Sequence, residues 1–356
     1  MIKLNLSKNF FLALVLSIIA FLFLLGSQNI FPERFRFDSD IIRLAMNDNE
    51  FKLMDQSYGN TAKFYLFFGL THNTDAIYFI IFSWTIFVFV TCMLLYKVKI
   101  RFNNNFIFLS YLLFALFYAA YFSDYAKDLV AILFLTLSLF FYDKKYFPIA
   151  LYIVILLYAF IFRTYWFLFF AVTILINYLI RSKISIFRII IFTLFIPCAV
   201  CFSYNLITHD YISDRRYNLN ESRLLRNDEN ARTMTEVILP PVNILNDTLN
   251  CIYSTINLFI PIDGIGSPNE LIYYSWLYIF IFCIKKNIIR IIKDYKKRII
   301  LCCCLAYIIT QGFFEPDIGS AFRHQLPFYM FWLTLINKEK SIKNLCTPDT
   351  IYPVLE

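Results

Sequence analysis

The sequence predicts an all-α fold: a polytopic integral membrane protein with about ten transmembrane helices. Three observations support this class. Hydrophobic residues make up 60% of the 356 residues and charged residues only 16%, whereas a soluble domain of this length carries more charge. Apolar runs close to the roughly 20 residues that cross a hydrocarbon core recur along the whole chain. Basic residues, finally, are distributed unequally between the two sets of connecting loops. We therefore expect residues 1–356 to form one transmembrane domain.

The apolar runs define the expected spans in order. They cover residues 10–30, 76–96, 106–122, 126–142, 147–162, 164–180, 189–206, 271–284, 299–314 and 321–336. The first run follows Lys3 and Lys8 and could pass for a signal peptide. It lacks a small-x-small cleavage site and further spans follow it, so we expect it to be the first helix.

Charge counting sets the expected topology. With the N-terminus in the cytoplasm, the inward segments contain 20 of the 33 basic residues but only five of the 25 acidic ones. Basic loops favour the cytoplasmic side of a membrane. We therefore expect both termini in the cytoplasm, and the hydrophilic stretch 208–240 as a large outer, periplasmic loop.

The two sides also differ in the kind of cation. Of the 20 inner basic residues 15 are lysines, whereas 10 of the 13 outer ones are arginines. A guanidinium binds phosphate or carboxylate through a bidentate fork that lysine cannot copy. The outer arginines therefore indicate anion binding; the alternative is that they pair with the many acidic residues of the same loops.

The densest polar segment, residues 315–324, lies between two strongly apolar runs. It contains Glu315, Asp317, Arg323 and His324, and ionisable groups beside a bilayer are costly and usually functional. We expect Arg323 and His324 in the first turn of the last helix, where a cation opposes the helix dipole. An anionic ligand would explain both charges. The alternative is an ordinary loop with an interfacial arginine.

Arg163 interrupts two long apolar runs and has no acidic residue near it in sequence. Tyr165 and Trp166 follow it and fit the aromatic belt at the outer membrane boundary. The side chain of this arginine could snorkel to the membrane interface, where its guanidinium would be solvated. We favour an unpaired arginine that faces a central cavity and binds phosphate.

Two further outer segments carry candidate site residues. The first outer loop contains Arg36 and the pair Asp38-x-Asp40, whose carboxylates could act as a general base or bind a divalent metal; the alternative is a solvated loop. The short Ser123–Asp128 stretch separates two apolar runs and is expected to cap the second. There Lys127 and Asp128 would lie just below the outer surface, as cap, local ion pair or ligand.

The outer loop 208–240 interleaves Arg215, Arg216 and Arg223 with acidic residues. Such mixed charge in a chain otherwise poor in charge predicts a lid or a substrate-binding loop. The segment after it, 241–262, is only moderately apolar and contains prolines and asparagines, so we expect a re-entrant or interfacial piece.

The nine cysteines lie almost all inside apolar segments. The Cys198-x-x-Cys201 pair has no flanking His or Asp, so we expect neither metal nor redox chemistry there. The spacing gives no disulfide framework.

The segment Glu315-Pro316-Asp317-x-Gly319-Ser320-x-x-Arg323-His324, placed before a last apolar run, resembles the closing motif of bacterial O-antigen and capsule repeat-unit polymerases of the Wzy type. The lone Arg163, the Lys127-Asp128 pair and the large Arg-bearing outer loop are similar to features of the same family. So are the length, the number of expected helices and the Phe-rich composition. The resemblance covers the chain as a plan and is specific at 315–324.

The resemblance implies a glycosyltransferase of the bacterial inner membrane. It would transfer a growing glycan from undecaprenyl diphosphate onto the non-reducing end of a new lipid-linked repeat unit, at the outer face. The implied partners are these two lipid-linked glycans, a chain-length regulator and a flippase, with no nucleic acid and no cofactor. No metal is required if arginines neutralise the diphosphate.

The residues take roles within this reaction. Arg163, Arg323 and an arginine of the outer loop would stabilise the leaving diphosphate. The general base is His324, Glu315, Asp317 or Asp38, and the sequence leaves this choice open. The substrate-binding set is Lys127, Asp128, Arg36, Asp38, Asp40, Arg215, Arg216 and Arg223.

Three other functions compete with the polymerase. One is a membrane glycosyltransferase of a different branch, in which Asp38 and Asp40 would lead. A flippase or transporter of lipid-linked sugars predicts charges along the mid-membrane and inverted repeats, whereas here the charges gather at one surface and no repeat is visible. A membrane sugar O-acyltransferase would carry an early Arg/His signature in its first helix, and the first apolar run contains neither residue.

Overall fold

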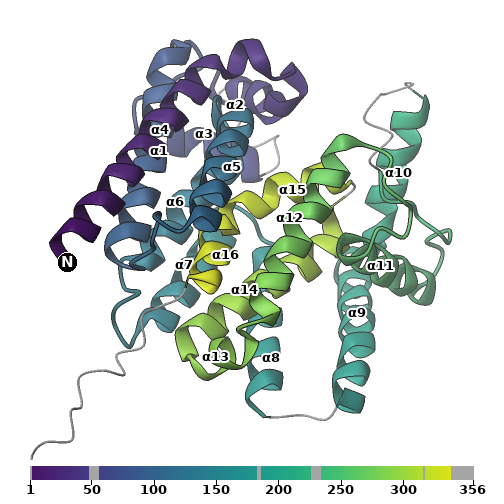
Figure 1. Ribbon diagram of the computed structural model, residues 1–356. Helices are drawn as coiled ribbons and strands as arrows, with labels where there is room; N and C mark the ends of the chain where they lie inside the picture. Colours follow the sequence, from purple (N-terminus) through teal and green to yellow (C-terminus); the bar gives the residue numbers. More distant parts are fainter. Residues whose placement is uncertain (1, 48–55, 183–185, 226–233, 316, 338–356) are drawn as a thin grey trace, which may run out of the picture.

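The computed structural model describes residues 2–47, 56–182, 186–225, 234–315 and 317–337. All regular secondary structure in these ranges is helical, with one isolated bridge between Met234 and Asp317 (Figure 1). The elements, in order, are α1 (Ile2–Ile30), η1 (Glu33–Arg36), α2 (Phe37–Asn47), α3 (Gln56–Phe67), α4 (Ala76–Tyr96), α5 (Asn105–Phe122), α6 (Lys127–Leu139), α7 (Phe147–Ile161), α8 (Trp166–Arg181), α9 (Ile186–Thr208), α10 (Ile212–Leu225), α11 (Ile244–Phe259), α12 (Pro268–Lys285), α13 (Ile288–Lys293), α14 (Tyr295–Phe314), α15 (Ile318–Gln325), η3 (Leu326–Phe328) and α16 (Tyr329–Ile336). The predicted all-α class is confirmed.

Every expected span coincides with a helix or a broken pair of helices, but they differ in length. Four helices of the described chain are long and apolar enough to cross a membrane: α1, α4, α5 and α14. Shorter apolar helices are α7, α8 and the later part of α9. The expectation of a membrane protein is thus supported, whereas the full count of ten spans is not established by helix length and composition.

Helix α14 lies at the centre of the packing and α1 at its edge. Over the most apolar 18 residues of each helix, 78% of α14 is buried inside the molecule, compared with 33% of α1. Helix α14 packs on α8, α11 and α16, whereas α1 packs on α4 and α5. Large apolar side chains of α1, such as Phe11 and Leu22, stay exposed on the outside. An apolar outer face of this kind suits contact with lipid.

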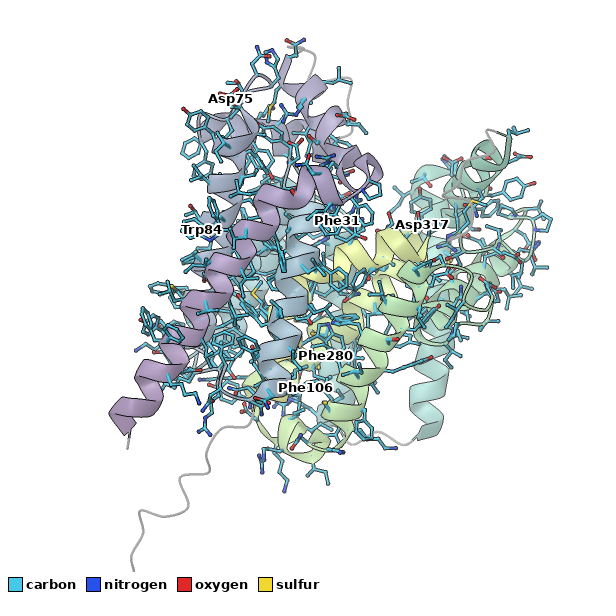
Figure 2. The ribbon with its side chains drawn as sticks, turned by 45° about the horizontal axis from the view of Figure 1, so that its top comes forward. Phe31, Asp75, Trp84, Phe106, Phe280 and Asp317 are labelled. Carbon is cyan, nitrogen blue, oxygen red and sulfur yellow. The ribbon has the colours of Figure 1, made fainter. Side chains whose placement is uncertain are left out.

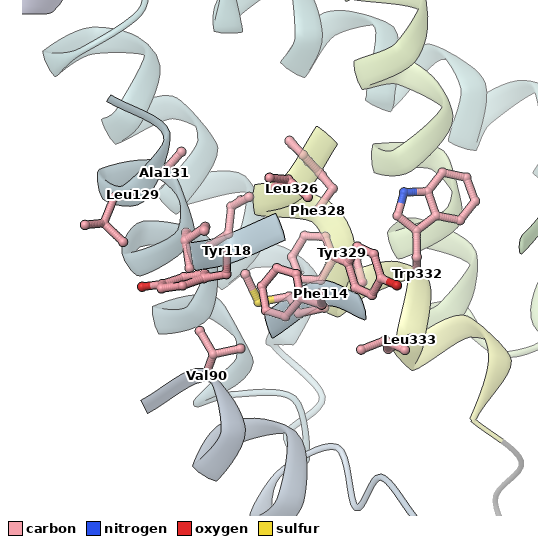
Figure 3. Packing of buried hydrophobic residues seen from close by; sticks show 14 of the residues in the cluster. Val90, Phe114, Tyr118, Leu129, Ala131, Leu326, Phe328, Tyr329, Trp332 and Leu333 are labelled. Carbon is pink, nitrogen blue, oxygen red and sulfur yellow. The ribbon is translucent and has the colours of Figure 1, made fainter. Parts of the chain in front are cut away.

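Aromatic side chains join the N-terminal helices to the C-terminal ones. Tyr329 of α16 stacks on Phe114 of α5 with ring centroids 4.8 Å apart, and its hydroxyl donates to Ser110 O (2.7 Å) (Figure 3). Trp276 of α12 also stacks on Tyr329, with ring centroids 5.9 Å apart. Buried aromatic pairs add about 0.5–1.5 kcal/mol beyond their burial, and the tyrosine finds the hydrogen bond that it needs.

The last expected span is divided into α15 and α16 by the 3₁₀ turn η3. Pro327 lies in this turn, and proline lacks the N–H that a continuous helix requires. Helix α15 begins at Asp317, whose carboxylate accepts from Ser320 N (2.7 Å). Arg323 and His324 therefore lie in its last turn, where a cation is favourable. The expectation that they occupy the first turn of the final helix and oppose its dipole is wrong.

Segments assigned to the inner side meet at one end of the bundle. Asn9 of α1 donates to Ile100 O (2.8 Å), and Asn337 lies against Val98 O (3.4 Å). Lys296, at the start of α14, donates to Tyr142 O (2.6 Å). Helix α13, within the basic stretch 285–298, lies toward the same end of the molecule as the N-terminus of α1 (Figure 1).

Segments assigned to the outer side meet at the opposite end. Arg43 of α2 pairs with Asp124 before α6 (2.9 Å), and Tyr125 donates to Thr71 O (2.8 Å). Figure 2 shows Asp75, before α4, near one end of the bundle and Phe106, at the start of α5, toward the other. The connecting segments thus divide between the two ends of the bundle in the same way as the charge count divides them between the two sides of the membrane.

Helix α11 falls within the segment 241–262, for which we expected a re-entrant or interfacial piece. It packs on α14 and α9 and buries polar residues, among them Asp247 and Asn250. Gly312 of α14 permits the close approach, because a Cβ built there would lie 2.6 Å from Thr255 Cα. Whether this segment enters the membrane stays a prediction.

We expect Gly312→Ala to lower the free energy of unfolding by about 1–3 kcal/mol, because the added methyl must push α11 away from α14. Thermal unfolding in detergent measures this. Gly26→Ala is the matched control: its Cβ would meet only the flexible end of Ile30 at 3.0 Å. Equal melting temperatures for the two variants would contradict the packing described.

Candidate active site

Ionisable side chains from five separate segments converge on one buried carboxylate, that of Asp128. Helix α6 supplies Lys127 and Asp128 at its start, and α15 supplies Arg323 and His324 in its last turn. The remaining members come from α2, the α7–α8 connection and the end of α14: Asp38, Arg163 and Glu315. All seven were predicted from the sequence, although as separate candidates. We call them the charged cluster.

Asp128 is the centre of the charged cluster and is fully buried. Its Oδ1 lies 3.0 Å from Arg163 Nη2, and Arg323 Nε lies 3.5 Å from its Oδ2. His324 Nδ1 is 2.8 Å from both oxygens. A buried carboxylate is tolerated only when it is paired and hydrogen-bonded; here His324 provides the hydrogen bond and the two guanidiniums provide the opposite charge.

Arg163 was expected to be unpaired, and this is wrong. The side chain is buried, with Asp128 as its counterion and Tyr165 Oη accepting from Nη1 (2.7 Å). Sequence inspection missed the pair because Asp128 lies on a different helix. The snorkelling alternative does not describe this buried side chain.

The 2.8 Å contacts of His324 with Asp128 favour a proton on Nδ1, although Arg163 Nη1 also lies 3.3 Å from this nitrogen. An ionised carboxylate can only accept, so Nδ1 donates to Asp128. The other ring nitrogen, Nε2, lies 3.3 Å from Glu315 Oε1. Two acceptors at that distance need one proton between them, held either by Nε2 or by Glu315. The arrangement Asp128–His324–Glu315 can therefore take up or release a proton at its Glu315 end.

Asp38 is the second buried aspartate of the charged cluster and contacts Arg323 and Tyr58. Its Oδ2 lies 3.4 Å from Arg323 Nη2, and its Oδ1 accepts from Tyr58 Oη (3.0 Å). Lys127 Nζ sits over the Tyr58 ring, 3.6 Å from the centroid. Burial alone would raise the pKa of Asp38, but the Arg323 and Lys127 charges outweigh it and hold the pKa below its ordinary value. The carboxylate thus stays ionised beside Arg323.

Several polar atoms of the charged cluster are buried yet lack a hydrogen bond of good geometry. They are Asp38 Oδ2, Arg163 Nη2 and Arg323 Nε. Each lies within ion-pair distance of an opposite charge, at 3.0–3.5 Å, but is not well aimed at it. Guanidinium N–H groups without a well-formed hydrogen bond can donate to further oxygen atoms. A phosphate group offers several such acceptor oxygens around one centre.

The backbone around the cluster is pinned by uncharged side chains. Gln311 of α14 donates to Ala321 O (3.0 Å) and accepts from Gln325, which fixes α15 on α14. Tyr65 donates to Ala126 O (2.8 Å) and Tyr158 to Lys127 O (3.2 Å), which fix the start of α6. The expected cap from Ser123 or Asp124 is absent from α6, where the N-cap is Ala126.

Sequence reasoning missed the tyrosines of the cluster. Tyr58 and Tyr165 contact the buried charges directly. Tyr165 carried a signal, because it lies two residues after Arg163, but it was interpreted as a membrane-boundary aromatic. Tyr58 carried none, since nothing in a single sequence places it beside Asp38.

The other predicted site residues lie outside the charged cluster. Asp317 is committed to the N-cap of α15. Arg36 lies in η1, and Asp40 is exposed on α2. Arg215 and Arg223 belong to α10, but their side chains lie outside the described residues.

Arg216 is buried and supports the end of α14 instead of opening toward a ligand. Its guanidinium donates to Gly312 O (2.8 Å), Phe313 O (3.1 Å) and Glu315 O (3.2 Å), and to Ser254 of α11. The last carbonyls of a helix lack partners of their own, so this arginine acts as a C-terminal cap. It holds the backbone at Glu315.

Arg216→Met is expected to destabilise the protein by about 2–4 kcal/mol, because several buried carbonyls lose a charged donor. Chemical unfolding followed by tryptophan fluorescence measures the loss. Arg181→Met, at the exposed end of α8, is the control and should change little. An Arg216→Met protein as stable as the control would show that these contacts do not contribute to the free energy of unfolding.

No family model, curated protein or solved structure matches the chain.

Proposed function

We propose that this chain is a polysaccharide polymerase that joins undecaprenyl-diphosphate-linked repeat units into an O-antigen or capsule at the outer face of the bacterial inner membrane. One observation carries the proposal: Arg163, Arg323 and His324 converge on Asp128 at the end of the bundle that the charge count assigns to the outside. Two guanidiniums and a proton-accepting group are what transfer of a glycan from a diphosphate requires.

The substrate class follows from the cations. A diphosphate leaving group develops negative charge as its bond to the sugar breaks, and guanidiniums bind such oxygens in bidentate fashion. Arg163 and Arg323 are held 3.0 and 3.5 Å from the shared Asp128 carboxylate, with donors incompletely used. Lys127 adds a third positive charge beside Tyr58. No metal is needed in this scheme.

The proposed step is a single displacement at the anomeric carbon of the donor glycan. A hydroxyl oxygen of the acceptor unit forms the new bond to that carbon, while the bond from the carbon to the diphosphate oxygen breaks. Undecaprenyl diphosphate leaves with the electron pair of the broken bond. The hydroxyl proton passes to His324 Nε2 or to Glu315, whose Oε1 lies 3.3 Å from that nitrogen.

Asp128 is a positioning residue in this scheme. It holds Nδ1 of His324 and so directs Nε2 toward Glu315, and the same carboxylate orients Arg163. Asp38 remains a second candidate base. Asp317 and Arg216 leave the proposed set, since the first caps α15 and the second caps α14.

The wider scheme keeps ten spans, cytoplasmic termini and a periplasmic loop at 208–240. The two-ended sorting of the connecting segments supports it. The proposed partners are the lipid-linked donor and acceptor, a chain-length regulator and a flippase.

Deletion of the gene tests the proposal in the cell. The expected result is surface glycan that carries single repeat units in place of long chains, with recovery when the wild-type gene is restored. Long-chain glycan that persists in the deletion strain would contradict a polymerase. Loss of all surface glycan would indicate a flippase instead, and normal chains without acetyl groups an O-acyltransferase.

A further inference from the structure

Two buried cysteines that lie 50 residues apart in sequence face each other across two helices. Cys201 of α9 and Cys251 of α11 are fully buried, with their Sγ atoms 3.7 Å apart. Ile212 and Phe313 enclose them in a small apolar cluster. No local sequence pattern indicates this pairing, because the two cysteines lie on different helices. Cys198 is exposed and takes no part.

Asp247 lies close enough to complete a three-ligand group with the two thiols, so a metal site has to be weighed first. Its carboxylate is already used by the start of α10. Oδ1 accepts from Ser213 N (2.9 Å) and Ser213 Oγ (2.6 Å), and Oδ2 from Ile212 N (3.1 Å). Within the described residues, this group has no fourth ligand. A structural zinc site takes four. The arrangement therefore favours bonding between the sulfurs over metal binding.

The pair lies near the end of the bundle that is assigned to the outside. Cys201 precedes the C-terminus of α9 at Thr208 by seven residues, about 10 Å of helix, and the outer loop follows. The space outside the bacterial inner membrane is oxidising, and disulfides form and persist there. An oxidising environment for this pair rests on the proposed outward orientation of 208–240 and is independent of the polymerase reaction.

We propose that Cys201 and Cys251 are a site of oxidative modification, joined by a disulfide when the chain folds at the outer face. The oxidant is a disulfide of a thiol oxidase. One cysteine thiolate attacks that disulfide and releases one oxidase thiol. The other thiolate then attacks the mixed disulfide at the first cysteine's sulfur and releases the second. Two protein thiols lose two protons and two electrons, and the oxidase disulfide becomes a dithiol. The reaction precedes the packing of α11, since fully buried thiols do not react.

The cross-link would stabilise the helices that support Glu315 of the charged cluster. It ties α9 to α11 and closes the loop that contains α10 and its arginines. Three residues beyond Cys251, Ser254 accepts from Arg216, which caps α14 just before Glu315. A covalent tie at this point stabilises the position of Glu315 through contacts that the structure already contains.

Mass spectrometry on the full chain tests the proposal. Intact cells are treated with N-ethylmaleimide to block free thiols, and the purified protein is digested without reductant. The expected result is a linked peptide pair carrying Cys201 and Cys251, which disappears on reduction. It should also be lost in Cys201→Ser and kept in Cys198→Ser. Recovery of both cysteines as unlinked thiols, even after diamide treatment of the cells, would overturn it. So would stoichiometric zinc in the purified protein.

Thermal unfolding gives a second readout that does not depend on the single variants. Reductant should lower the melting temperature of the wild-type protein by several degrees, and should leave the Cys201→Ser/Cys251→Ser variant unchanged. An equal response of both proteins to reductant would also overturn the proposal.

Discussion

Cells whose only copy of the gene carries Arg323→Ala are expected to display surface glycan of single repeat units, at normal protein levels. Arg323 lies 3.4 Å from Asp38 and 3.5 Å from Asp128, and its Nε has no well-formed hydrogen bond. In the proposed reaction its guanidinium meets the charge that develops on the diphosphate. Removal of one such donor typically costs a factor of about 10²–10³ in rate.

Arg323→Lys separates charge from geometry. Lysine keeps the positive charge but cannot form a bidentate fork, so we expect short chains and a smaller loss of rate. Arg181→Ala, at the exposed end of α8, is the matched control and should give full-length chains. Chain-length distributions on a gel compare all strains. Full-length chains from Arg323→Ala would remove this residue from the reaction.

Asp128→Asn is expected to abolish chain growth and also to destabilise the protein by about 3–5 kcal/mol. The change preserves the size of the side chain but removes the charge that Arg163, Arg323 and His324 share. A buried ion pair that loses one partner leaves an uncompensated charge, which costs several kcal/mol. His324 also loses the carboxylate that fixes its Nδ1 proton.

A double variant separates these two effects. Asp128→Asn/Arg163→Met removes a buried positive charge along with the negative one, so it should recover much of the stability of Asp128→Asn. It should stay inactive, because it lacks both Arg163, which is proposed to bind the diphosphate, and Asp128, whose carboxylate positions His324. Asp143→Asn, at an exposed position outside the charged cluster, serves as the control. An Asp128→Asn protein with wild-type stability would contradict the central position of this carboxylate.

The sequence was informative where a single local pattern decides the structure. The apolar run 76–96 coincides with α4, and the other expected spans fall on helices. Hydrophobic burial needs only composition over a window, which a single chain displays. Ionisable residues beside apolar runs also picked out the seven residues that the structure brings together in the charged cluster, because a charge is costly there and needs a partner.

What could not be predicted depends on tertiary contacts. The pairing of Arg163 with Asp128, the capping role of Arg216 and the meeting of Cys201 with Cys251 each join different helices. Local sequence contains no record of which helices become neighbours. The error over Arg323 and His324 has another origin: Asp317 begins α15 earlier than expected, which moves both residues to its last turn.

Transfer of a glycan from a diphosphate lipid is the reaction that we propose for the charged cluster. The most direct measurement uses purified protein in lipid vesicles, the undecaprenyl-diphosphate-linked repeat unit as the sole substrate, and joint detection of lengthened glycan and released undecaprenyl diphosphate. Wild type and Arg181→Ala are expected to form the two products in equal amounts, whereas Arg323→Ala and His324→Ala should form neither at a comparable rate. Chain growth by His324→Ala and Arg323→Ala at the wild-type rate would contradict the proposed reaction.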